Sequence, residues 1–342
     1  MEDIYEGKVE MKSVNEKKYL GDIITTDMNN EKNIKDKTNK AIGNTNKIVS
    51  SLQERPYGKH TFKAAKLMRD GILIGSLLNN AETWINVTKK DIEKLEKPDN
   101  ILQEKLFSEK ASKAFQYLEF GILPVKYVLI AKRLKFLKYI LNESTESMIR
   151  KVYTEQKKDS KKGDFISQIK QDMKDVQLDI EDEEVETMST WKWKNVINNK
   201  VESAAFEFLI KENDNKQKTS HILFDKLEMN DYLIENKNTK LSKTIYSIRA
   251  GVFDLKALKR WKYTDNLCVA CNLFEENMQH FMQCTKYGRQ SLSNWKLIYE
   301  NSSKTETKVE IAWEAQERYK LRSKIIQDDG PDFNQAPFAP LF

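Results

Sequence analysis

Four residues of the types that bind soft metal ions lie close together near the end of the chain. The stretch 267–284 reads LCVACNLFEENMQHFMQC and contains the pattern C-x2-C-x8-H-x3-C. It holds all three cysteines of the chain, Cys268, Cys271 and Cys284, together with His280, one of three histidines. Three thiolates and one imidazole are a standard tetrahedral ligand set for structural Zn²⁺. Because these four ligands fill the coordination shell, we predict a structural zinc site without an open catalytic position.

The spacing of the four ligands predicts how the chain holds them. A C-x-x-C pair lets two thiolates converge on one ion from a tight turn. His280 and Cys284 are four residues apart, so they face the same way from a short helix. We therefore predict a CCHC zinc knuckle over residues 267–290, made of a turn and a helix closed on one Zn²⁺.

Two other uses of these cysteines remain open at this point. A reduced protein can bury cysteines as small apolar residues, or use a C-x-x-C pair for redox chemistry. Scattered core cysteines would not gather beside a histidine, and a redox pair leaves Cys284 and His280 without a role. An odd number of cysteines argues against a disulfide framework and for a reducing compartment, nuclear or cytoplasmic.

The composition indicates a mainly α fold. The chain has 342 residues, of which 39% are hydrophobic and 32% are charged, with only 11 Gly and 6 Pro. Such a chain builds modest cores from amphipathic helices rather than a turn-rich β fold. The longest apolar run, 71–78, is too short to cross a bilayer, so no membrane partner is expected. The formal net charge of +6 permits a nucleic-acid partner without requiring one.

Changes in pattern along the chain divide it into seven predicted segments. Loosely alternating, β-branched residues near the start predict short strands, and helical periodicity begins at about residue 31. The segments are a β remnant (1–27), a helical domain (28–150), a charged linker (151–190), a second helical domain (191–266), the zinc knuckle (267–290), C-terminal helices (291–326) and a disordered tail (327–342).

Two of these segments rest on specific patterns. The linker is predicted from the basic run KKDSKKGD (157–164) and the acidic run EDEEVE (181–186), which favour a solvated segment with at most a short helix. The helical pattern restarts at WKWK (191–194), whose two tryptophans are predicted to anchor a second core.

A capping box at Thr88–Asp91, in the first helical domain, predicts the start of another helix.

Two basic helices have more than one interpretation. The predicted helix 31–53 carries Lys32, Lys35, Lys37 and Lys40 opposite its apolar face, which is typical either of a solvated face or of contact with phosphates. In the predicted helix 125–141, aromatic residues interleave with lysines, as they do in nucleic-acid grooves and in ordinary core helices.

Familiar catalytic motifs are absent from the sequence. It has no Gly-rich phosphate loop, no G-x-S-x-G and no H-E-x-x-H. The paired carboxylates Asp328–Asp329 sit in a polar segment that offers no rigid strand to hold two metal ions. We therefore assign no catalytic residue, and whether the chain is an enzyme is left open.

In this order, four blocks of the chain resemble the C-terminal part of a non-LTR (LINE-like) retrotransposon reverse transcriptase. The resemblance covers roughly residues 15–150 and 241–290. The blocks are KKYLGDIIT (17–25) followed by the lysine-rich helix, LMRDGILIGSLLNNAETW (67–84) with the helix after it, YLEFGILPVKYVLIAKRLKFLKYIL (117–141), and the segment 245–284 that ends in the knuckle.

The resemblance implies a nucleic-acid-binding segment that follows a polymerase palm. Residues 28–150 would form a thumb-like and post-thumb helical domain. The palm aspartates of the family precede the matched region, so this chain is expected not to polymerise alone, and a palm would be supplied in trans. Eight cations are implied to contact RNA or DNA: Lys32, Lys35, Lys37 and Lys40 in the thumb-like helix, and Arg249, Lys256, Lys259 and Arg260 before the knuckle.

Two further hypotheses stand beside this one. The chain can be a helical protein-interaction module in which zinc only staples a small fold, since such modules owe their folding to the metal. It can also be a relic without a selected role, although an intact set of four ligands argues against decay.

Overall fold

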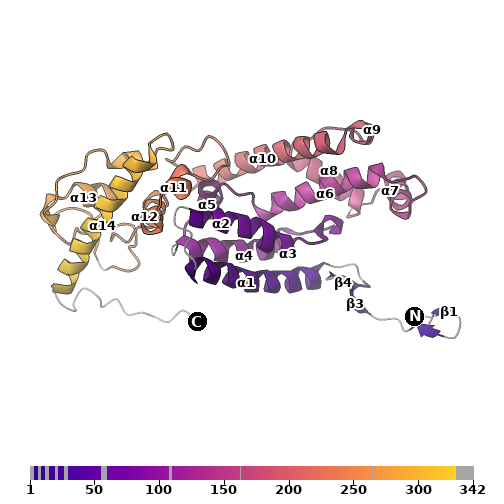
Figure 1. Ribbon diagram of the computed structural model, residues 1–342, viewed down its shortest axis with the longest axis horizontal. Coiled ribbons are helices and arrows are strands. Elements are labelled where there is room, and N and C mark those ends of the chain that lie inside the picture. Colours follow the sequence, from indigo (N-terminus) through magenta and orange to yellow (C-terminus); the bar gives the residue numbers. More distant parts are fainter. Residues whose placement is uncertain are drawn as a thin grey trace. The chain divides into compact units, whose positions relative to one another are not determined.

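The computed structural model describes residues 4–6, 9–11, 15–19, 22–26, 30–54, 60–107, 110–161, 163–263 and 265–328 (Figure 1). The described chain is mainly helical, which confirms the predicted fold class. The tail predicted at 327–342 lies outside the described residues from 329 onwards.

The described residues near the N-terminus form two antiparallel hairpins. β1 (Ile4–Glu6) pairs with β2 (Val9–Met11), and β3 (Glu16–Tyr19) pairs with β4 (Asp22–Thr25) in the register Lys17 to Ile24. The rest is helical, with short elements between longer helices. The helices are α1 (Glu31–Glu54), α2 (Thr61–Met68), the π-helix η2 (Arg69–Ile74), α3 (Gly75–Leu77), η3 (Ala81–Thr83), α4 (Lys89–Phe107), α5 (Lys113–Phe120), α6 (Val125–Asn142), α7 (Met148–Lys158), α8 (Phe165–Asp175), α9 (Asp182–Thr187), α10 (Thr190–Asp214), α11 (Asp231–Glu235), α12 (Thr239–Arg249), α13 (Met278–Gln283), η4 (Thr285–Tyr287), η5 (Trp295–Tyr299) and α14 (Thr305–Asp328).

The chain forms two compact units that interleave in sequence. Unit 1 comprises Met1–Lys47, Met68–Ile101 and Leu123–Ala205, and unit 2 comprises Ile48–Leu67, Leu102–Ile122 and Phe206–Phe342. The predicted segments were continuous stretches, because sequence patterns report local structure and not which stretches pack together. The predicted capping box is confirmed: the Asp91 N–H donates to Thr88 Oγ1 and the Thr88 N–H donates to Asp91 Oδ2, both at 3.2 Å.

In unit 1, the segment 151–190 is folded, which corrects the prediction of a solvated linker. Its helices α7, α8 and α9 pack on α6. Arg133 of α6 donates two hydrogen bonds to the buried carboxylate of Asp172 in α8, at 2.5 and 2.7 Å. Lys138 of α6 donates to the carbonyl oxygen of Val185 in α9 at 2.8 Å. The sequence did not predict these contacts, because Arg133, Asp172 and Lys138 are charged residues, and charged residues usually face solvent.

Only one of the two tryptophans of α10 anchors the core of unit 1. Trp193 is fully buried and its Nε1–H donates to the carbonyl oxygen of Leu134 in α6 at 2.9 Å. Trp191 is 75% exposed. Residues two apart point to nearly opposite sides of a helix, so both could not face the same core.

In unit 2, stacked aromatic rings and buried ion pairs contribute to the core. Phe107 stacks on Phe62 and on Tyr246, with ring centroids 5.2 and 3.8 Å apart. Arg249 of α12 donates to both carboxylate oxygens of Glu119 in α5, at 2.6 and 3.0 Å, and neither side chain is exposed.

Among the described residues, no single helix has the length and apolar character needed to cross a membrane. One bent pair, Lys113–Phe120 with Val125–Asn142, meets that test only when its two helices are taken together.

We predict that Arg133→Met destabilises the protein by about 3–5 kcal/mol, because it leaves the Asp172 carboxylate buried without its partner. The control is Lys126→Met on the same helix, which breaks a more exposed ion pair with Asp175 and is expected to cost at most about 1 kcal/mol. Urea unfolding measures both. Equal small losses would contradict a folded 151–190 segment.

Candidate metal centre

The four predicted ligands lie together in unit 2. The ligand atoms of Cys268, Cys271, His280 and Cys284 are all within 4.8 Å of one another. The sulfurs of Cys268 and Cys284 are 3.9 Å apart, and Cys271 Sγ is 3.2 Å from His280 Nε2. In a tetrahedron with metal–sulfur distances of about 2.3 Å, two sulfurs are about 3.8 Å apart. The group therefore has the spacing needed to hold a metal ion.

A tight backbone turn positions the first two cysteines. Leu267 and Glu275 form an isolated antiparallel bridge, and the Cys268 N–H donates to the Phe274 carbonyl oxygen at 2.7 Å. At the tip, the Asn272 N–H donates to the Cys268 carbonyl oxygen at 2.8 Å. Asn272 has φ 52°, a left-handed conformation that asparagine tolerates better than most residues. This turn brings both thiols to the same side.

The short helix α13 positions the other two ligands. Asn277 is its N-cap and accepts a hydrogen bond from the His280 N–H at 2.9 Å. Met278, Phe281 and Met282 are buried and fix the rotation of the helix. Cys284 is the C-cap, and its N–H donates to the His280 carbonyl oxygen at 2.7 Å. The predicted turn-and-helix arrangement is thus present.

The surroundings shift the pKa values of these ligands in different directions. Burial raises the pKa of the Cys268 thiol to about 11. Burial also acts to raise the pKa of Cys271, but the N–H groups of Leu273 and Phe274 point at its sulfur and lower the pKa overall. Burial lowers the pKa of His280, which favours the neutral imidazole that a metal ion requires.

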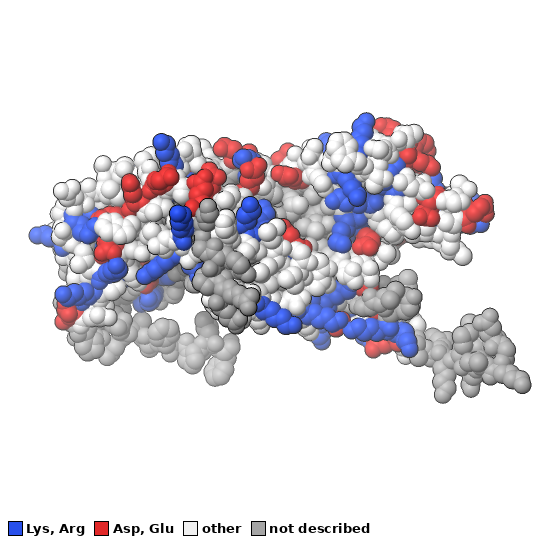
Figure 2. Space-filling model, in the orientation of Figure 1, with Lys and Arg blue, Asp and Glu red and all other residues white. Residues whose placement is uncertain are grey.

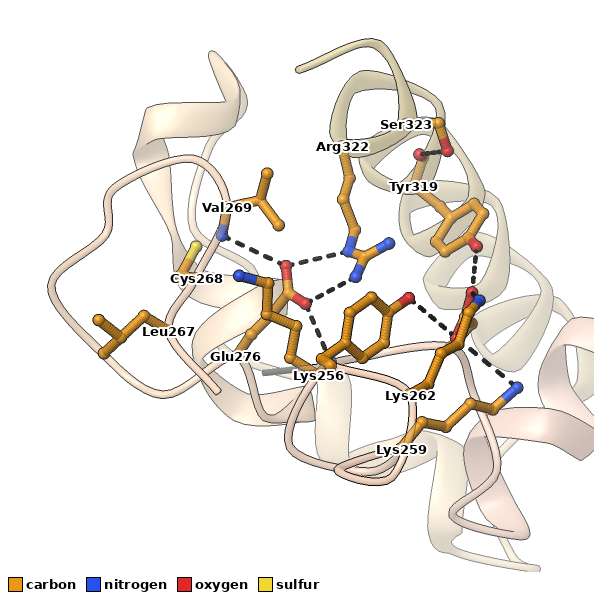
Figure 3. Close-up of polar contacts among 12 residues, drawn as sticks. Lys256, Lys259, Lys262, Leu267, Cys268, Val269, Glu276, Tyr319, Arg322 and Ser323 are labelled. Atoms are coloured by element: carbon orange, nitrogen blue, oxygen red, sulfur yellow. Dashed lines mark hydrogen bonds and ion pairs between the residues drawn. The ribbon is translucent and has the colours of Figure 1, made fainter. Parts of the chain in front are cut away.

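A buried carboxylate joins the knuckle to α14 (Figure 3). Arg322 donates from Nε and Nη2 to the two carboxylate oxygens of Glu276, at 3.0 and 2.9 Å. The same carboxylate accepts the Lys256 N–H at 3.0 Å, the Tyr287 O–H at 3.2 Å and the Val269 N–H at 3.5 Å. The Glu276 side chain is fully buried and that of Arg322 is nearly so, so this hub belongs to the interior.

A second arginine of α14 holds the end of α13, which lies beside it in Figure 1. Arg318 Nη1 donates to the carbonyl oxygens of Phe281 and Cys284, at 3.1 and 2.8 Å. A cation is favourable at this helix end, where carbonyl groups lack partners. Arg318 and Arg322 are four residues apart and therefore share one face of α14.

These supporting residues were missed in the sequence. Glu276, Arg318 and Arg322 carry no motif, and Glu276 is separated from its partner by 46 residues. The only available signal is the i, i+4 spacing of two arginines in a helix that otherwise reads as a charged surface.

Three of the eight predicted nucleic-acid contacts are buried, which corrects their assignment. Lys37 pairs with Asp22 at 2.7 Å and lies over the ring of Trp84, all within unit 1. Arg249 is the partner of Glu119 in the core of unit 2. Lys256 is 3% exposed, and its Nζ pairs with Asp265 at 2.8 Å. Lys37 and Arg249 neutralise partly buried and buried carboxylates, and Lys256 is itself buried while its partner Asp265 is exposed.

The other predicted contacts lie nearer the surface. Lys259 is mostly buried and 3.7 Å from Asp254. The exposed members are Lys32, Lys35, Lys40 and Arg260. Figure 2 shows Lys and Arg side chains gathered over α1 along the lower edge of the view. Whether the exposed members contact nucleic acid stays a prediction.

Comparisons with protein-family models, with curated proteins and with solved structures found no match to this chain. The function proposed below therefore rests on the geometry of the Cys3His group and its surroundings.

We predict that the purified protein holds one metal ion per chain and that His280→Asn lowers its metal content. His60→Asn is the control, because His60 is exposed and belongs to no described metal group. Elemental analysis after dialysis measures the metal content. Equal metal content in both variants would contradict the assignment of His280.

We also predict that Glu276→Gln weakens metal binding by about 10–100-fold, as changes in the groups that support metal ligands commonly do. The neighbouring Glu275→Gln is the control, since that side chain pairs with the exposed Arg260. Competition with a chromophoric chelator gives both affinities. A Glu276 variant that binds metal like the Glu275 variant would show that the hub does not support the site.

Proposed function

We propose that this chain is a nucleic-acid-binding C-terminal segment of a LINE-like reverse transcriptase, without the palm aspartates, in which a Zn²⁺ ion holds the knuckle. The observation that carries the proposal is the surface of the knuckle region. Two aromatic rings are exposed, Trp261 just before the knuckle and Phe274 within it, and the cations Lys218 and Arg260 accompany them.

The donor set favours zinc over other ions. Three thiolates exclude the hard cations Mg²⁺ and Ca²⁺, which prefer oxygen ligands. A tetrahedral set of three sulfurs and one imidazole nitrogen, all supplied by the protein, is typical of structural zinc. Such an ion would provide folding energy and leave the chemistry of any bound strand untouched.

The exposed rings have the properties of a stacking platform for bases. Trp261 is 76% exposed and Phe274 is 61% exposed. The Phe274 ring lies against the imidazole of His280, with centroids 5.2 Å apart, so a metal ion on His280 would also orient Phe274. Stacking of a base on such rings contributes about 1–3 kcal/mol per base and needs no particular sequence.

Cations beside these rings suit the phosphates of the same strand. Lys218 Nζ lies 5.8 Å from the centre of the Trp261 ring. Arg260 pairs with Glu275 at 2.8 Å, but both side chains are solvent-accessible, so this pair adds little stability and can yield to a phosphate. The lysines of α1 offer a further phosphate contact surface in unit 1.

The exposed apolar side chains favour one alternative, a zinc-stapled protein-interaction module. Leu273 is 71% exposed next to Phe274, and an apolar patch of this kind also suits a protein partner. The two functions differ in their response to salt, since phosphate contacts weaken steeply as salt rises and apolar contacts do not.

We predict that Phe274→Ala and Trp261→Ala each weaken binding of single-stranded RNA or DNA by about 1–3 kcal/mol. Binding should also fall with rising salt and be lost when a chelator removes the metal. Fluorescence anisotropy over a salt series measures all three effects.

Leu223→Ala is the control for this experiment, because Leu223 is an exposed apolar residue of unit 2 outside the knuckle. If the unmodified protein binds no single strand at low salt, the nucleic-acid function is refuted and the protein-interaction module takes its place.

A further inference from the structure

Three lysines of unit 1 come together where α6 meets α10. The two helices are joined by the hydrogen bond from Trp193 Nε1 to the Leu134 carbonyl oxygen, at 2.9 Å. Lys135 follows Leu134 directly, and Lys194 follows Trp193 directly. Lys132 lies one turn before Lys135 on α6. The contact between the helices therefore brings positive side chains of both helices to one place.

The cations of α6 differ in how they are neutralised. Lys126 pairs with Asp175 at 2.6 Å, Arg133 binds Asp172, and Lys138 donates to backbone carbonyl groups. For Lys135 and Lys194, no carboxylate lies within ion-pair distance among the described residues. Lys132 is 3.9 Å from Glu82, which is the edge of ion-pair range.

Lys135 is also partly removed from water. Burial lowers its pKa, and the positive charges of Lys194 and Lys132 lower the pKa further. Like charges held together in a half-buried place raise the free energy of the folded protein. A bound anion would offset this repulsion, so the cluster has the charge of an anion-binding site.

Aromatic side chains extend the cluster along both helices. Tyr139 lies one turn after Lys135 on α6, is about half exposed, and stacks on Phe136 with centroids 5.8 Å apart. The nearby Glu143, at the end of the helix, raises the pKa of the Tyr139 hydroxyl. Trp191 lies one turn before Lys194 on α10 and is mostly exposed. Cations flanked by exposed rings suit a strand that offers both phosphates and bases.

We propose that Lys132, Lys135 and Lys194 bind backbone phosphates of a single-stranded nucleic acid, whose neighbouring bases stack on Tyr139 and Trp191. The proposal rests on the nucleic-acid-binding function above and adds a contact site within unit 1, on α6 and α10.

The test is the double variant Lys135→Gln with Lys194→Gln, measured with a fluorescent oligodeoxythymidine of about 20 nucleotides, which exceeds a typical site size. Each phosphate contact on a single strand contributes about 0.7 to the slope of log affinity against log salt. We expect the slope to fall by about 1.4 and the affinity at about 0.1 M salt to fall about 25-fold. The single variant Lys194→Gln, at an exposed position, should lose about fivefold.

The matched control is Lys211→Gln with Lys216→Gln, which removes the same charge from exposed positions in unit 2. The inference is overturned if this control pair and the test pair weaken binding equally, or if the test pair has no effect while Phe274→Ala does; in both cases the proposed function stands. No binding by the unmodified protein refutes the proposed function instead.

The thermal midpoint of the double variant Lys135→Gln with Lys194→Gln is measured without nucleic acid. It should be unchanged or higher, because repulsion among the lysines is relieved. A clear drop would indicate that Lys135 supports the fold.

Discussion

The bond between Arg322 and Glu276 is the interaction on which the candidate metal centre depends. A carboxylate without water costs several kcal/mol unless a cation and hydrogen-bond donors replace the water. Glu276 has both: the guanidinium of Arg322 and donors from the knuckle and the loop before it. Its partner comes from α14, so the knuckle reaches its low-energy conformation only with that helix docked. Arg318, one turn away on the same helix, reinforces this coupling by binding the end of α13.

The same type of bond recurs in the interior of each unit. Arg69 binds Asp99 and Arg133 binds Asp172 in unit 1, while Arg249 binds Glu119 in unit 2, each through two hydrogen bonds. The planar guanidinium fits a carboxylate in this way better than an ammonium group does. In each unit, these pairs neutralise charged side chains that the helices carry into the interior. They also decide which cations remain for a partner, because an arginine in the core cannot contact a phosphate.

The Cys3His group that could hold a metal ion was predicted from the sequence, because the spacing of its residues is local. C-x-x-C makes a turn and H-x3-C makes one face of a helix, whatever the rest of the chain does. The mainly α fold and the capping box at Thr88 follow from local rules in the same way. The role of Lys37 and Arg249 could not be predicted, because it depends on Asp22 and Glu119, residues at a distance in the sequence. The folded 151–190 segment was missed for the same reason: its charge looks solvated until Arg133 is seen beside Asp172.

X-ray absorption at the zinc edge of the purified protein tests the Cys3His site most directly. We expect a first shell of three sulfurs at about 2.3 Å and one nitrogen at about 2.0–2.1 Å. A shell made of oxygen and nitrogen atoms, or one with fewer than three sulfurs, would contradict the Cys3His assignment. In that case, the orientation of Phe274 and the nucleic-acid surface proposed around it would lose their structural basis.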